Sequence, residues 1–244
     1  MEKCRLCLKE NELCKSHIFP EFMYENTYDD NSKFFEFSLL NRNKYRSKGF
    51  YEKLLCRNCE DRINVYETYA HNLIYNSARP LIIKKRAWIK ISEYNYDKFK
   101  LFVLSLIWRC SISTLDFFES VSLGIYEEEL RNILLNQKST PVNYFPCTIS
   151  QTHINHKMPN GFFLKPSQYK TTYDDKTIYQ FFADGIFFCI GLGSVFANAF
   201  PNGSSVSPKS LRIGYSSATD FDDLMNLFVD LKKGGKFSVY ETRT

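Results

Sequence analysis

Apolar residues recur at helical spacing in three stretches of the chain, and these stretches predict its helices. The first predicts a helix over residues 57–77, which Pro80 ends. The second, residues 97–137, carries two amphipathic stripes in succession. The third predicts an amphipathic helix over residues 220–233, ended by Gly234 and Gly235. The apolar positions that define the first two stretches are Ile63, Tyr66, Ala70, Leu73, Ile74, Phe99, Phe102, Val103, Leu106, Ile107, Leu130, Ile133 and Leu134.

Short apolar runs bounded by turn residues dominate the chain beyond Pro141 and predict strands. Asp184 and Gly185 separate two of these runs, and Asp-Gly suits the tight turn of a β-hairpin. A further apolar and basic run, residues 81–86, predicts a strand ahead of the second helical stretch. We therefore expect an α+β fold with a mainly antiparallel C-terminal sheet and a helix beside it. The strands predicted beyond Pro141 cover residues 145–152, 162–164, 178–182, 186–190, 211–215 and 237–240.

The change of pattern along the chain divides it into three regions. Residues 1–78 form a cysteine-rich region, residues 79–140 a basic connector with helices, and residues 141–244 an α+β region. The last two regions could also form one domain, because 244 residues suit either one large domain or two small ones. With 44% hydrophobic and 24% charged residues, the composition is that of an ordinary globular protein and argues against disorder.

The eight cysteines favour a reducing compartment over a disulfide framework. Such frameworks belong to small secreted domains, and the opening residues of this chain do not resemble a signal peptide. The most apolar stretches, residues 101–107 and 186–200, fall short of the roughly 20 apolar residues of a membrane-spanning helix. We expect a cytoplasmic protein without a membrane segment.

Positive charge is concentrated in the first part of the chain. Residues 1–100 carry 19 Lys and Arg against 14 Asp and Glu, whereas residues 101–244 carry 13 of each. This bias favours a phosphate-rich partner, although a solvated basic face gives the same count. The side chains expected to contact nucleic-acid phosphates are Arg46, Arg79, Lys84, Lys85, Arg86 and Lys90.

Two Cys-x2-Cys pairs, separated by residues 8–55, predict a metal site. Cys4 and Cys7 form the first pair, and Cys56 and Cys59 form the second. Two such pairs complete a closed tetrahedral site for structural zinc. Both pairs lie among polar residues, whereas the later cysteines lie in apolar helix or strand patterns and are expected in the core. The expected core cysteines are Cys110, Cys147 and Cys189, and Cys14 fits either group.

The cysteine pairs and the segment between them resemble the HNH endonucleases, in particular the zinc-stapled branch of the ββα-metal (treble-clef) fold. The resemblance covers residues 1–75. Leu104–Arg109 and Leu123-Gly124 also resemble recurrent features of bacterial proteins that carry the same Ser-His-Ile-x-Pro segment. The matching residues in the first region are Cys4, Cys7, His17-Ile18-Phe19-Pro20 and Leu54-Leu55-Cys56-Arg57-Asn58-Cys59.

This resemblance implies an endonuclease that hydrolyses phosphodiester bonds of DNA, with RNA left open. His17 is then the general base, and a divalent ion, Mg²⁺ or Mn²⁺, offsets the charge that develops on the phosphate. Glu60 follows the last cysteine, at a position that the family uses for a metal ligand, and Asn64 and Glu52 are expected to assist. By analogy, a nuclease joined to an α+β region suits a bacterial anti-phage defence or restriction effector with a regulatory partner protein.

At three positions the chain departs from the family pattern. Ser16 stands where the family usually has an acidic or histidine metal ligand, and Tyr51 stands where it often has asparagine. Glu60 stands after the last cysteine, where the family often has histidine or asparagine. The helix after Cys59 nevertheless repeats polar residues at i, i+4, i+7 and i+11, which can hold Mg²⁺ opposite His17 or simply face water. These residues are Glu60, Asn64, Glu67 and His71.

Three alternatives stay open. His17 can serve only to hydrogen-bond the zinc loop, in which case the first region is a catalytically inactive zinc module that binds nucleic acid or protein. The C-terminal sheet can also carry the main role by binding a ligand. His153 and His156 form a weaker metal candidate, because imidazoles three apart on a strand or turn need not converge. Gly191-Leu192-Gly193 lacks the third glycine of a dinucleotide loop and is expected to serve strand packing.

Overall fold

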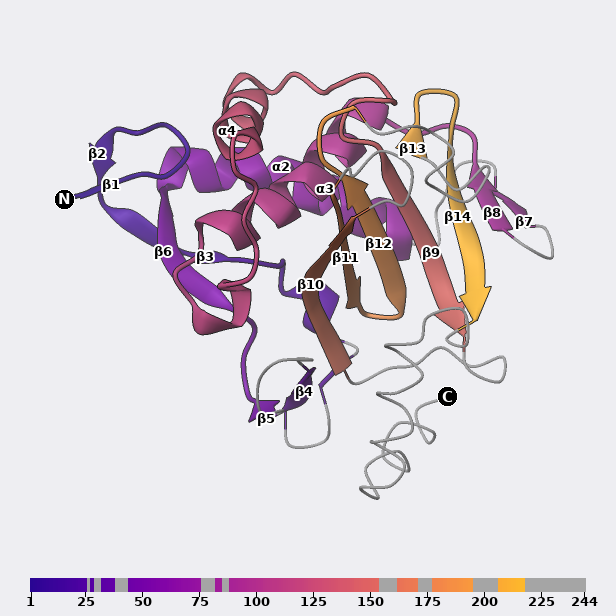
Figure 1. Ribbon diagram of the computed structural model, residues 1–244, viewed down its shortest axis with the longest axis horizontal. Helices are drawn as coiled ribbons and strands as arrows, with labels where there is room; N and C mark the ends of the chain where they lie inside the picture. Colours follow the sequence, from indigo (N-terminus) through magenta and orange to yellow (C-terminus); the bar gives the residue numbers. More distant parts are fainter. Residues whose placement is uncertain are drawn as a thin grey trace.

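A computed structural model describes residues 1–25, 27–28, 32–37, 44–75, 82–84, 88–153, 162–170, 177–194 and 206–217. These residues form a mixed α+β structure in which helices pack beside a large sheet (Figure 1). The described helices are α1 (Phe22–Glu25), α2 (Arg57–Tyr75), α3 (Tyr96–Ile112) and α4 (Tyr126–Asn136), with a 3-10 turn, η1 (Asp116–Phe118). The predicted helices over 57–77 and 97–137 are confirmed, the second as two helices. The predicted helix 220–233 and strand 237–240 lie outside the described residues.

The large sheet has the strand order β5-β4-β10-β11-β12-β9-β14-β8-β7, with β13 beside β14. Its described strand pairs are antiparallel except β10–β4 and β14–β9, so the predicted mainly antiparallel sheet is confirmed. Its strands are β4 (Phe34–Phe37), β5 (Lys44–Arg46), β7 (Ile82–Lys84), β8 (Trp88–Ile91), β9 (Cys147–His153), β10 (Phe162–Lys170), β11 (Thr177–Ala183), β12 (Ile186–Gly191), β13 (Val206–Ser207) and β14 (Ser210–Ser217).

The cysteine-rich region contributes to this sheet. The β4–β5 hairpin lies between the two cysteine pairs in sequence, yet β4 pairs with β10 in parallel. The polar composition around these strands predicts a loop, so the hairpin is a difference from expectation. Phe34 is fully buried, and its ring packs with those of Tyr24, Phe50 and, from β10, Phe163. The division of the chain at residues 78 and 140 stays a prediction.

Two smaller sheets lie at the start of the chain. β1 (Glu2–Lys3) pairs with β2 (Glu10–Asn11), and β3 (Leu13–His17) pairs with β6 (Tyr51–Cys56). β6 leads directly into α2, so a two-stranded ribbon ends against the first turn of a helix. His17 therefore lies at the end of β3.

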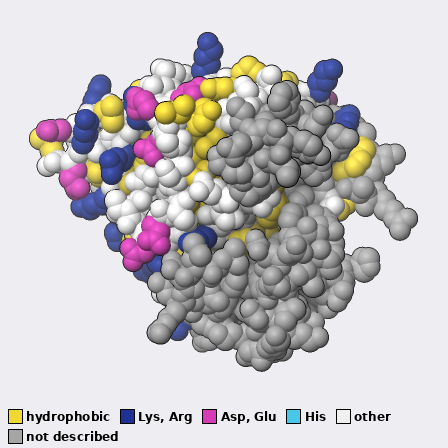
Figure 2. All heavy atoms as spheres, in the orientation of Figure 1, with side chains coloured by type: hydrophobic (Ala, Val, Ile, Leu, Met, Phe, Trp, Pro, Cys, Tyr) yellow, Lys and Arg dark blue, Asp and Glu magenta, His cyan; other side chains and the backbone are white. Residues whose placement is uncertain are grey.

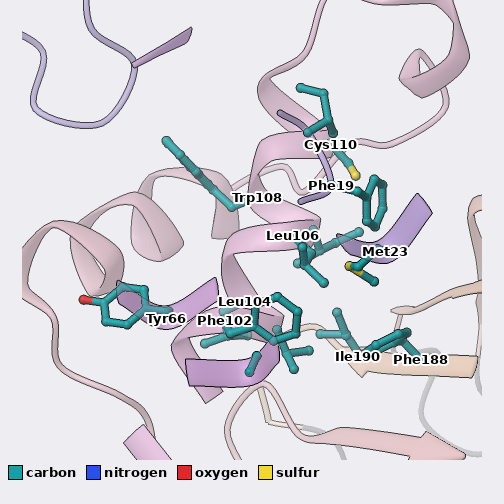
Figure 3. Close-up of a cluster of buried hydrophobic side chains, with 14 of the residues drawn as sticks. Phe19, Met23, Tyr66, Phe102, Leu104, Leu106, Trp108, Cys110, Phe188 and Ile190 are labelled. Atoms are coloured by element: carbon teal, nitrogen blue, oxygen red, sulfur yellow. The ribbon is translucent and has the colours of Figure 1, made fainter. Parts of the chain in front are cut away.

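Helix α3 occupies the centre of the described structure. Every residue from Phe99 to Cys110 is buried, whereas the sequence predicts an amphipathic helix. The difference follows from packing on several sides, since a helix enclosed in this way needs no solvent-facing stripe. Figure 3 shows Phe188 and Ile190 of β12 directed toward one side of α3 and Tyr66 of α2 on another.

Two glycine predictions are confirmed at the edge of the sheet. Asp184 and Gly185 have positive φ angles of 50° and 76° in the turn that joins β11 to β12, as a tight hairpin turn requires. Gly193 also has a positive φ angle, and a Cβ built there would lie 2.5 Å from the Tyr126 hydroxyl. Gly193 therefore permits close packing of the strand end against α4.

Aromatic rings connect the cysteine-rich region to the sheet. The Phe19 ring, two residues after His17, lies 4.6 Å from Phe163 of β10 and 5.2 Å from Phe181 of β11 between centroids. Phe19 is fully buried and also faces Cys110 and Leu106 of α3 (Figure 3). The backbone after His17 is thus anchored in the main core. None of the helices that the structure describes has the length and apolar character that a membrane crossing requires.

Replacing Phe19 with alanine should lower the free energy of unfolding by about 3–5 kcal/mol, because a cavity forms where three elements meet. Chemical denaturation of the purified chain measures this change. Ile125→Ala is the matched control, because Ile125 is 85% exposed and its loss should change stability by about 0.5 kcal/mol or less. Equal losses for the two variants would contradict the anchoring role of Phe19.

Candidate metal centre and adjoining polar site

Four cysteines from three elements converge at the start of the chain. Cys4 and Cys7 lie in the turn between β1 and β2, Cys56 ends β6, and Cys59 lies in the first turn of α2. Their four Sγ atoms all lie within 4.8 Å of one another, and those of Cys7 and Cys56 are 3.8 Å apart. This donor set can hold a metal ion. In the described part of the chain, it is the one group of three or more His, Cys, Asp or Glu side chains close enough to do so.

Backbone hydrogen bonds shape the first cysteine pair into a knuckle. The Leu8 amide donates to the Cys4 carbonyl at 2.9 Å, and the Cys4 amide donates to the Lys9 carbonyl at 2.9 Å. Leu8 takes a positive φ angle of 61°, which reverses the chain after Cys7. The Cys56 amide in turn donates to the Cys4 Sγ at 3.3 Å. This last bond fixes the two cysteine pairs against each other.

The electrostatics of the cluster favour a cation. Burial raises the pKa of Cys59, and the negative charge of Cys4 raises it further. Burial also opposes ionisation of Cys4, but the amides of Cys56, Cys7 and Leu6 together bring the pKa of Cys4 below its ordinary value. Without a cation, simultaneous ionisation of these neighbouring thiols is therefore unfavourable. A bound metal ion removes this conflict because it stabilises each thiolate directly.

The other cysteines lie apart from the cluster. Cys110, Cys147 and Cys189 are buried in α3, β9 and β12, as predicted from their apolar surroundings. Cys14 is half-buried in β3, where it pairs with Leu55 across the ribbon. The structure thus separates Cys14 from the four-cysteine donor set.

A polar site adjoins the metal cluster at the junction of β3 and α2. The fully buried Ser16 donates its hydroxyl to Glu60 Oε2 at 2.6 Å. Burial raises the pKa of Glu60, whereas the Ser16 hydrogen bond and the positive charge of Arg109 act in the opposite direction. The strand residue before His17 and the helix residue after Cys59 are therefore in direct contact, although Ser16 and Glu60 are 44 residues apart.

His17 is held on both its side chain and its backbone. Its Nε2 lies 3.3 Å from Glu21 Oε2, and its ring meets the Tyr51 ring edge-on at 6.2 Å. Its carbonyl accepts a hydrogen bond of 2.6 Å from Arg109 Nη1. The imidazole keeps 40% of its surface exposed, so it is accessible to a ligand.

The polar residues of α2 do not all share one environment. Glu67 pairs with Arg109 at 2.6 Å between Oε1 and Nη2. His71 packs against the Phe22 ring at 5.0 Å, and Asn64 is exposed with its Oδ1 3.4 Å from the Thr68 hydroxyl. Glu60 and Glu67 thus face Arg109, whereas Asn64 faces solvent. The predicted roles of Glu60 and Asn64 as metal ligands stay predictions.

Glu52 has a different set of partners. Its carboxylate accepts hydrogen bonds from the hydroxyls of Ser113 and Thr114 at 2.8 and 2.6 Å, and from the Thr114 amide at 3.0 Å. These bonds tie β6 to the end of α3. The predicted helper role of Glu52 in catalysis stays a prediction, and here its oxygens bind α3 instead.

The predicted phosphate contacts are spread over the chain. Arg46 of β5 lies over the Phe50 ring at 4.3 Å, and Lys90 is half-buried in β8. Lys84 belongs to β7, but its side chain, like Arg79, Lys85 and Arg86, lies outside the described residues, as does the side chain of His153 and all of His156. On the described part of the face in Figure 2, basic and acidic side chains are interspersed.

A further candidate surface lies on the β3–β6 ribbon. Lys15 pairs with Lys53 and His17 pairs with Tyr51, and we call these four residues the ribbon face. Lys15, Tyr51 and Lys53 are exposed, with the Lys15 ammonium 5.0 Å from the Tyr51 ring centroid. Lys53 also lies 3.9 Å from Glu2. The sequence signal for this surface is the two-residue spacing within Lys15-x-His17 and Tyr51-x-Lys53, because alternate residues of a strand lie on the same face.

Comparison of this chain with protein-family models, with curated proteins and with solved structures finds no significant match.

Changing Cys7 to serine should abolish stoichiometric metal binding, because the closed site loses one of its four sulfur donors. Elemental analysis of the purified chain by mass spectrometry measures the metal content, with about one ion per wild-type chain expected for four sulfur ligands. Cys14→Ser is the matched control and should keep the metal. Metal retained by the Cys7 variant, or lost equally by both, would contradict the assignment of the cluster.

Proposed function

We propose that this chain is a metal-dependent, HNH-type endonuclease that hydrolyses phosphodiester bonds of DNA. The observation that carries the proposal is the contact between the end of β3 and the start of α2, where Ser16 bonds Glu60 beside an accessible His17. The four-cysteine cluster joins the turn ahead of β3 to β6, the partner strand of β3, and to α2. We further propose that the ribbon and α2 form a ββα-metal, treble-clef module, and that zinc occupies the cluster because four thiolates suit its closed tetrahedral sites.

In this proposal His17 acts as the general base that takes a proton from the attacking water. An imidazole suits this task because its ordinary pKa lies near neutrality. Glu21, 3.3 Å from Nε2, orients the ring. The exposed part of the imidazole leaves room for a phosphodiester to approach.

Glu60 is the leading ligand for a catalytic Mg²⁺ or Mn²⁺, with Asn64 one helical turn later. The donor types fit, since hard cations prefer carboxylate and amide oxygens. Ser16 occupies Oε2 of Glu60, so Oε1 is the oxygen that we assign to the metal. Such an ion would offset the charge that develops on the phosphate and the departing oxygen.

The ribbon face suits the nucleic acid itself. Lys15 and Lys53 offer charges for phosphates, and the exposed ring of Tyr51 offers a surface for base stacking. All three residues border His17, so a strand bound there would pass the proposed base. We also propose that the large sheet beyond residue 141 senses or gates this activity in a defence or restriction effector, by analogy with other two-part nucleases.

His17→Ala should lower the rate of DNA cleavage by about 10²–10⁴-fold, because the reaction loses its general base. The assay uses plasmid, single-stranded DNA and RNA with Mg²⁺ or Mn²⁺ added to the metal-loaded chain. Glu60→Gln should reduce cleavage and raise the concentration of divalent ion needed for half-maximal rate. Lys209→Gln, an exposed residue between β13 and β14, serves as the control and should cleave DNA at the wild-type rate.

Wild-type cleavage that survives in His17→Ala would rule out this residue as the base. The metal content of each variant should equal that of the wild type, which shows that a lower cleavage rate does not come from unfolding. Cleavage of RNA but not DNA would change the proposed substrate to RNA and would not affect the assignment of the site residues.

The double variant Lys15→Gln/Lys53→Gln should weaken nucleic-acid binding and reduce the salt dependence of the binding constant. Each lost phosphate contact lowers the slope of log K against log salt by about 0.7–0.9. Fluorescence anisotropy with labelled DNA measures this in a His17→Ala background, which prevents cleavage. Lys209→Gln, in the turn between β13 and β14, should leave both quantities unchanged. An unchanged slope in the double variant would exclude the ribbon face.

A binding module without catalysis is the second candidate function. It is favoured by the hydrogen bond that occupies Glu60 and by the lack, among the described residues, of a second cluster of three His, Cys, Asp or Glu donors. It predicts tight zinc and nucleic-acid binding without metal-dependent cleavage, and His17→Ala should then leave binding unchanged.

A further inference from the structure

One arginine outside the cysteine-rich region reaches both halves of the candidate site. Arg109 lies in the last turn of α3 and is 1% exposed. Its Nη1 donates to the His17 carbonyl at 2.6 Å, and its Nη2 pairs with Glu67 Oε1 at 2.6 Å. Its Nε donates to the Ser105 carbonyl at 3.3 Å. Each nitrogen of the guanidinium therefore has a partner.

These partners belong to the two elements that carry the proposed chemistry. His17 ends β3, and Glu67 lies two turns after Glu60 on α2. A planar guanidinium presents its donors in a fixed fork, so two bonds from one group set the distance and angle between the groups that accept them. The fork of Arg109 thus fixes the end of β3 relative to α2 close to the point where Ser16 and Glu60 meet.

We propose that Arg109 is a positioning residue for His17, supplied to the site by helix α3. This inference rests on the proposed function, because it assigns Arg109 a part in holding the base of that reaction. The contact is made to the backbone of His17, so its effect is on where the imidazole stands. Small displacements of a reacting group are costly, since a shift of about 1 Å can reduce a rate by about 100-fold.

The competing explanation is that Arg109 only neutralises the poorly exposed Glu67. A buried ion pair can often be replaced by apolar residues of similar volume without loss of stability, whereas removal of one partner leaves an uncompensated charge. The double variant Glu67→Met/Arg109→Met therefore separates the two roles. It removes the charge pair together with the bond to His17, so neither member of the pair is left without its partner.

The experiment compares wild type, Arg109→Lys and the double methionine variant in denaturation, in steady-state DNA cleavage and in NMR of ¹⁵N-labelled histidines. Arg131→Gln is the matched control, because Arg131 of α4 donates to the Leu6 carbonyl at 2.7 Å and does not contact His17. We expect the double variant to unfold near the wild-type midpoint with kcat reduced about 100-fold, KM within about twofold and shifted His17 ring resonances. Arg109→Lys should retain stability but not kcat, because an ammonium lacks the fork.

Wild-type kcat and unshifted His17 resonances in the stable double variant would overturn the proposal, and so would an equal loss of kcat in Arg131→Gln. If the double variant does not fold, the kcat and the His17 resonances of Arg109→Lys test the proposal instead. If the wild-type chain does not cleave nucleic acid, the proposed function fails, yet the His17 resonances still test the positioning. Shifted resonances in the Arg109 variants alone would support it, and unchanged ones would overturn it.

Discussion

Burial of helix α3 is the constraint on which the described structure depends. A helix enclosed on all sides requires the sheet, α2 and the cysteine-rich region to be present together, because each covers a part of its surface. Its polar residues must then find partners inside the protein. Lys100 donates to the Phe145 carbonyl at 2.5 Å, and Arg109 is satisfied by Ser105, His17 and Glu67. Because Arg109 is buried, it needs polar partners inside the protein, and it finds two of them, His17 and Glu67, at the proposed site.

The four-cysteine cluster lies beside the β3–β6 ribbon and bears on the stability of that ribbon. The β3–β6 ribbon is short, and an isolated two-stranded ribbon is only marginally stable in water. The cluster joins the turn ahead of β3 to the junction of β6 with α2, so a bound metal ion holds that junction by coordination. Phe19 then secures the backbone immediately after His17 in the aromatic core. His17 thus lies on a segment between the first cysteine pair, Cys4 and Cys7, and the buried ring of Phe19.

Local signals in the sequence predicted the helices α2, α3 and α4, the strands β7, β9, β10, β11, β12 and β14, and the four cysteines of the cluster. These features depend on periodicity, turn chemistry or ligand spacing, which a short window contains. The pairing of β4 with β10, the pairing of β8 with β14 and the contact between Arg109 and His17 were not predictable, because each joins residues about 90 or more positions apart in sequence. The amphipathic reading of α3 was wrong for the same reason, since the elements that enclose it are distant in the chain. Glu52, predicted near the chemistry, bonds Ser113 and Thr114 instead.

The two carboxylates at the junction, Glu60 and Glu67, are compensated unequally. Two carboxylates, Glu60 and Glu67, share the surroundings of Arg109, and Glu67 forms the direct ion pair. One negative charge then remains in a partly buried place, where desolvation penalises it and raises the pKa of Glu60. The hydroxyl of Ser16 compensates only in part, because it is a neutral donor. The incomplete compensation of the Glu60 charge is the electrostatic feature that supports its proposed role as a metal ligand.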